Sequence, residues 1–148
     1  RRLAEAETKP SGDICQMTAF CAHWKKEYDD TVQYLDRKRA SIAYALKAGL
    51  KLLAGTDSWM RGIRFGAIAD EIRCLVDYGC APMQALQAAT LWPAQAMGWE
   101  EIGVLAPGKQ ADVVAVAGDP IGCSNRADIT AVGRVVLVVR DGQVVSGN

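Results

Sequence analysis

The chain has 148 residues and a mass of 15.9 kDa; half of its residues are hydrophobic, 23% are charged, and 17 basic side chains balance 17 acidic ones. This composition is typical of a folded globular chain of single-domain size, and a net charge of zero argues against nucleic acid or an anionic membrane as a partner. The length is below the roughly 200 to 250 residues of a complete eight-stranded parallel α/β barrel, so the chain alone cannot build one.

Residues 1–20 are predicted to be irregular, because the turn-forming run Lys9-Pro10-Ser11-Gly12-Asp13 stops a helix. Residues 24–48 repeat apolar side chains at spacings of three and four, which predicts an amphipathic helix that ends at Gly49. The short apolar run of residues 50–54 lies between Gly49 and Gly55 and is predicted to form a buried parallel strand.

Three further helical segments are expected before Gly98. One covers residues 67–78, a second begins at Pro82, and Trp92-Pro93 should kink or end the second before a last turn at 94–97. Beyond Gly98 the valine-rich runs 113–116 and 135–139 predict strands, and Asp141-Gly142 predicts a hairpin. We therefore expect two parts, residues 1–98 and 99–148.

The sequence contains few signals for membrane insertion, secretion or disulfide formation. No apolar run approaches the roughly 18 residues of a membrane span, and no signal peptide follows Arg1, so a cytoplasmic location without membrane contact is expected. The five cysteines include no CxxC pair and are interpreted mostly as small buried hydrophobic residues. The absence of an initiating methionine favours a fragment or a processed piece.

Asp57 is the main catalytic candidate. It directly follows the predicted strand in Gly55-Thr56-Asp57-Ser58, and active sites of parallel α/β folds gather at the carboxyl ends of their strands. A turn-capping role is the alternative, because aspartate often bonds to the backbone that follows it.

Four segments in order resemble metal-dependent amidohydrolases, and within them the imidazolonepropionase-like and Xaa-Pro dipeptidase-like (prolidase-like) subgroup. These segments are residues 48–58 around GTDS, 71–90 ending in ALQAAT, 102–114 with IGVLAPGKQADVV, and the closing elements at 118–120 and 139–145. The resemblance implies an α/β fold: the C-terminal part of a (β/α)8 barrel, with the last βα unit and extra helices, followed by strands of a composite β-sandwich.

The resemblance also implies chemistry for Asp57. Members of this family hold one or two divalent metals, and zinc is the expected one; Asp57 would be a metal ligand and the general base that takes a proton from an activated water. Thr56 and Ser58 would orient Asp57 or line the pocket. Ser58, Trp59 and Arg61 would contact a small-molecule substrate, with Arg64 as an alternative to Arg61; for the arginines a solvated loop charge, and for Trp59 packing at the barrel rim, remain alternatives.

The sequence departs from the family in its histidines. His23 is the only one, and no His-x-His pair occurs, although a catalytic zinc site needs about three protein ligands. The other ligands would lie in an N-terminal remainder of the fold. We therefore expect part of an enzyme that hydrolyses an amide, cyclic amide or dipeptide C–N bond, inactive alone, with that remainder or a second copy as partner; the alternative is a non-catalytic remnant that serves assembly or binding.

Overall fold

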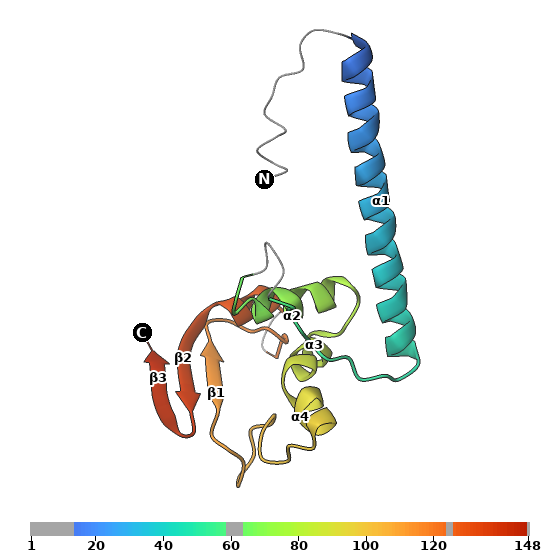
Figure 1. Ribbon diagram of the computed structural model, residues 1–148. Coiled ribbons are helices and arrows are strands. Elements are labelled where there is room, and N and C mark those ends of the chain that lie inside the picture. Colours follow the sequence, from blue (N-terminus) through green and yellow to red (C-terminus); the bar gives the residue numbers. More distant parts are fainter. Residues whose placement is uncertain (1–13, 59–63, 124–125, 148) are drawn as a thin grey trace. The chain divides into compact units, whose positions relative to one another are not determined.

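The computed structural model describes residues 14–58, 64–123 and 126–147 (Figure 1). The chain divides into two units, residues 1–40 and residues 41–148. The first described element, α1 (Ile14–Lys47), begins in the first unit and ends in the second. None of the helices in the described ranges is both long and apolar enough to span a membrane.

Helix α1 starts earlier than the sequence analysis expected. Residues 14–20 are helical, so the prediction of an irregular segment is wrong there, while residues 1–13 lie outside the described residues. Ile14–Phe20 contains neither glycine nor proline, and the breaking residues all come before it. The other end is as predicted: the Gly49 amide donates to the Leu46 carbonyl at 3.0 Å and the Leu50 amide to the Ala45 carbonyl at 3.0 Å.

Three short helices follow α1 in the second unit. They are α2 (Ile68–Asp77), α3 (Pro82–Ala89) and α4 (Leu91–Met97), and the first of them confirms the predicted helix at 67–78. The buried side chains of α2 and α3 meet in one cluster, in which the alanines let the helices approach closely. Its buried members are Ile72, Leu75, Cys80, Ala85 and Ala88.

The break between α3 and α4 comes before the position that the sequence indicated. Helix α3 ends at Ala89, and Pro93 sits within the first turn of α4 rather than at a helix end. A proline is tolerated there, because the first amides of a helix have no partner within it. Gly98 ends α4, as expected.

The predicted strand at residues 50–54 does not form. Side-chain exposure alternates along the segment as in an extended chain, but within the described ranges no strand pairs with it. One backbone hydrogen bond, from the Ala54 amide to the Ala88 carbonyl at 2.9 Å, joins it to the end of α3. Leu50 and Leu53 are 58% and 54% exposed. The prediction of a buried parallel strand is wrong for this chain, because a strand needs a neighbour to complete its ladder.

Strands β1 (Val113–Val116), β2 (Val135–Arg140) and β3 (Gln143–Gly147) form an antiparallel sheet in that order (Figure 1). The β2–β3 turn is the predicted Asp141-Gly142 hairpin, with φ of +50° and +76°. No described residue of these strands is fully buried. The 3-10 helix η2 (Ile129–Gly133), which the sequence analysis did not predict, packs between β1 and α2.

The described cysteines are free and differ in exposure. Cys80 is buried, Cys74 is half-buried and Cys123 is exposed, so the prediction of buried cysteines is correct for Cys80 and wrong for Cys123. Burial raises the pKa of both the Cys74 and the Cys80 thiols. Both therefore remain protonated and behave as small hydrophobic side chains at neutral pH.

Gly103 lies against α4, and its replacement tests this contact. A Cβ atom there would stand 2.9 Å from the Ala94 Cβ and 3.1 Å from the Leu91 Cα, at a φ of +92°. We expect Gly103→Ala to lower the free energy of unfolding by about 2 kcal/mol or more, from backbone strain plus overpacking.

Gly108→Ala is the matched control, because Gly108 has a φ of +83° and open space around it. It should lose only about 1 kcal/mol, the backbone part alone. Urea denaturation of both variants measures the difference, and equal losses would show that the contact with α4 contributes nothing.

Asp128 gives a pH-dependent prediction. The Thr130 hydroxyl and the Arg134 guanidinium, the latter 2.6 Å from an Asp128 oxygen, hold the pKa of the Asp128 carboxyl below its ordinary value. A lowered pKa in the folded state stabilises the fold above the unfolded value of about 4, and this contribution disappears as the pH falls through the folded value.

The stability difference between the native chain and Asp128→Asn should therefore be constant near neutral pH and shrink below about pH 4. Urea denaturation at a series of pH values measures it. A difference that stays unchanged down to the acid limit of folding would assign the role of Asp128 to capping η2 rather than to its charge.

Candidate functional site

Asp57 lies at the end of the extended segment 51–58. Exposure alternates along this segment: Leu52, Ala54, Thr56 and Ser58 are half-buried, and the residues between them are exposed, Asp57 among them. Leu52 and Ala54 pack against the core cluster. The segment therefore turns one row of side chains to the core and presents Asp57 on the opposite side.

The backbone of Asp57 is left-handed, with a φ of +49°. Aspartate tolerates this region better than most residues, but the conformation is uncommon outside turns and helix ends. On either side of Asp57 the hydroxyls of Thr56 and Ser58 hydrogen-bond to each other at 2.5 Å. The turn-capping alternative concerns the backbone at residues 59–61, which lies outside the described residues.

The structure describes only some of the predicted substrate contacts. Ser58 is described, whereas Trp59 and Arg61 lie outside the described residues. Arg64, the alternative to Arg61, has an exposed side chain 3.8 Å from Asp70 in the first turn of α2. This contact is consistent with the alternative in which Arg64 is a solvated charge on the loop. An acidic side chain at the start of a helix interacts favourably with the helix dipole and can also pair with a nearby cation.

Two further carboxylates can be placed. Glu71 lies half-buried in the first turn of α2. Asp112 accepts hydrogen bonds from the Asp141 amide at 2.7 Å and from the Gln110 side chain at 3.1 Å. Asp112 thus joins the start of β1 to the hairpin, which is a structural role.

The described residues do not assemble a metal site on their own. Within residues 14–58, 64–123 and 126–147 there is no group of three or more histidine, cysteine, aspartate or glutamate side chains that could hold an ion. His23 is in α1, but its side chain is not described. The exposed Asp57 carboxylate has the chemistry of a single ligand, and a catalytic site would need others from outside this part of the chain.

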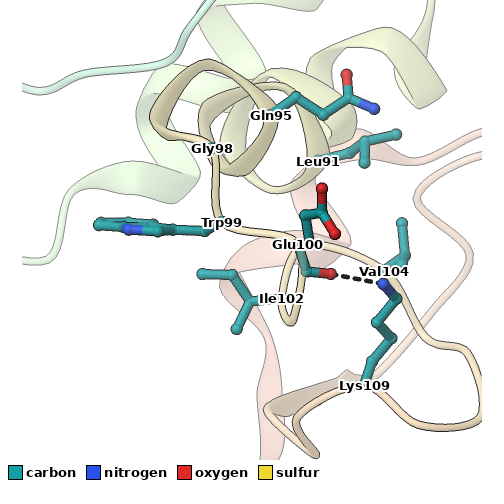
Figure 2. A pocket seen from close by; sticks show the side chains of 8 residues that line it. All are labelled: Leu91, Gln95, Gly98, Trp99, Glu100, Ile102, Val104 and Lys109. Atoms are coloured by element: carbon teal, nitrogen blue, oxygen red, sulfur yellow. Dashed lines mark hydrogen bonds between the residues drawn. The ribbon is translucent and has the colours of Figure 1, made fainter.

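A pocket that the sequence did not indicate lies elsewhere. Figure 2 shows it at the end of α4 and the loop that follows. Its volume is about 380 Å³. The Lys109 ammonium donates to the Glu100 carbonyl at 2.5 Å across one side. No predicted site residue lines it, so we assign it no part in catalysis. Its lining residues are Leu91, Gln95, Gly98, Trp99, Glu100, Ile102, Val104 and Lys109.

Residues 6–145 match the model of the amidohydrolase family. The chain therefore belongs to this family, whose matched members include enzymes that act on C–N bonds. An adenine deaminase of Ligilactobacillus salivarius is 37% identical over 79 residues, which are 53% of this chain and 14% of the deaminase.

Two solved structures share the fold. A Xaa-Pro dipeptidase with methionine bound in its active site is 31% identical, with a TM-score of 0.64 over 74% of this chain and 25% of that protein. Molinate hydrolase is 28% identical, with a TM-score of 0.61 over 71% of this chain and 25% of that protein. The chain thus spans about a quarter or less of the length of these relatives.

Proposed function

We propose that this chain is the C-terminal part of a metal-dependent amidohydrolase that hydrolyses a C–N bond. The observation that supports this most is Asp57, an exposed carboxylate held at the end of an extended segment in a chain of this family. In this proposal residues 1–98 belong to the barrel and residues 99–148 to a composite β-sandwich.

Asp57 performs the proton transfer in this proposal. Its carboxylate accepts a proton from the attacking water and passes it to the leaving nitrogen, as a general base and then a general acid. One or two divalent metals, with zinc expected, would supply Lewis acidity at the site and take Asp57 as one ligand. The other ligands would come from the N-terminal remainder of the fold.

The substrate is proposed to be a small molecule with an amide, cyclic amide or dipeptide bond. The similarity to a Xaa-Pro dipeptidase supports the prolidase-like subgroup, whereas the relatives named adenine deaminases add the C–N bond of an aminopurine as a candidate. Trp59 and Arg61 are the proposed substrate contacts, and Ser58, directly after Asp57, is a candidate contact through its hydroxyl. The proposed location is the cytoplasm.

One observation favours the alternative, an assembly or binding module. Apolar side chains are exposed along the extended segment and on the sheet, among them Leu53 at 54% and Val144 at 66%. Exposed apolar surface of this kind favours association with another chain or a second copy. The same surface is also what the last strand of an incomplete barrel would present, so activity decides between the two functions.

Replacement of Asp57 tests the catalytic proposal. In the full-length enzyme we expect Asp57→Asn to lower kcat by about 100- to 10,000-fold, because the amide cannot accept the proton. Asp77→Asn is the matched control, since Asp77 is an exposed aspartate at the end of α2. It should keep native activity, and a fully active Asp57→Asn enzyme would contradict the proposed role.

Complementation tests the proposed partner. We expect the 148-residue chain alone to retain no stoichiometric zinc after dialysis and to show no amidase activity, and the chain mixed with its N-terminal remainder to gain both. Metal analysis and hydrolysis of an N-acyl amino acid provide the measurements. Equal activity of the isolated chain would refute the need for a partner, and a stable homo-oligomer that gains neither metal nor activity would favour the binding module.

A further inference from the structure

We propose that the hydroxyls of Thr56 and Ser58 form a clamp that positions the carboxylate of Asp57. This inference rests on the proposed function of Asp57 and adds a positioning role for two residues beside it. It assigns the Ser58 hydroxyl to the orientation of the base rather than to contact with the substrate.

The clamp lies beneath Asp57, on the side of the segment that faces the core. Thr56 and Ser58 are half-buried in the same row as Leu52 and Ala54, both of which pack against the core cluster. The Ala54 amide is bonded to the Ala88 carbonyl, so the segment is fixed to α3 two residues before the clamp begins. The Thr56 and Ser58 side chains therefore lie on the side of the segment that is fixed to the core, and Asp57 is exposed on the opposite side.

The hydrogen bond between the Thr56 and Ser58 hydroxyls requires the left-handed backbone of Asp57, and in turn restrains it. In a regular strand, alternate residues stand about 6.6 Å apart and their side chains point the same way in parallel, too far for two short hydroxyl side chains to bond. The φ of +49° at Asp57 departs from that geometry, and the Thr56 and Ser58 oxygens lie 2.5 Å apart. Loss of either hydroxyl would free Asp57 to return to an extended φ and would redirect its carboxylate.

Among the described residues, no helix or strand includes Asp57. Within the described ranges, the other residue besides glycine with a positive φ is Asp141, in a hairpin turn that demands this geometry. Ser58, directly after Asp57, lies in a turn, and residues 59–63 are outside the described residues. A residue held in a sparsely populated region needs local restraint, and such residues concentrate at functional sites. The Thr56–Ser58 bond is one restraint of this kind that the structure provides.

Kinetics of the full-length enzyme test the clamp. We expect Thr56→Val and Ser58→Ala each to lower kcat about five- to tenfold with KM unchanged, the cost of one lost hydrogen bond that acts on the transition state. The double variant should be no slower than either single variant, because either change breaks the same bond. Thr56→Ser keeps the hydroxyl and should restore most of the activity.

Two results would overturn the clamp. A rise in KM without loss of kcat for Ser58→Ala would make Ser58 a substrate contact, and losses that multiply in the double variant would mean that the hydroxyls act independently. A structural measurement does not need activity: the backbone ¹³C chemical shifts of Asp57 in the 148-residue chain should move from left-handed towards extended values in Thr56→Val, and unchanged shifts would also overturn it. If Asp57→Asn is fully active while these shifts do move, the proposed function fails and the backbone clamp stands.

Discussion

One backbone hydrogen bond, from the Ala54 amide to the Ala88 carbonyl, determines how the segment that carries Asp57 is placed. An extended segment normally shares its amides and carbonyls with neighbouring strands, and here the described chain offers it the end of a helix instead. The row of Leu52 and Ala54 adds apolar contact with the core cluster. The Lys51 ammonium, in the exposed row, also donates to the Gln95 side chain of α4 at 2.8 Å. Leu53 and Asp57 of the same row remain exposed.

The position of Asp57 could be predicted because its signals are local. A short apolar run between glycines, followed by a carboxylate, indicates an extended segment with a polar end, and the structure has this order along residues 50–58. The strand itself could not be predicted reliably. A strand forms only by pairing with a neighbouring strand, and the local sequence describes only one of the two. The φ of Asp57 also left no signal, because aspartate is compatible with several backbone conformations.

In the second half of the fold, too, features with a local sequence signal could be predicted and features that depend on tertiary contacts could not. Asp141-Gly142 predicts its hairpin correctly, because both residues accept the positive φ that the two-residue turn needs. Helix η2 left no periodicity in the sequence, because it is one short stretch held by the Asp128 side chain at its start. The pocket beside Trp99 and Lys109 likewise arises from how a loop passes α4, a tertiary feature that no motif encodes.

The hairpin has a consequence for the order in which the sheet folds. Strands β2 and β3 meet across two residues, so their pairing is a fast local event, whereas β1 must find β2 across residues 117–134. Arg134 joins the two ends of that connection, because its guanidinium bonds to the Ala117 carbonyl, to Thr130 and to Asp128. We therefore expect β1 to dock after the hairpin has formed, because its pairing with β2 closes the longer loop.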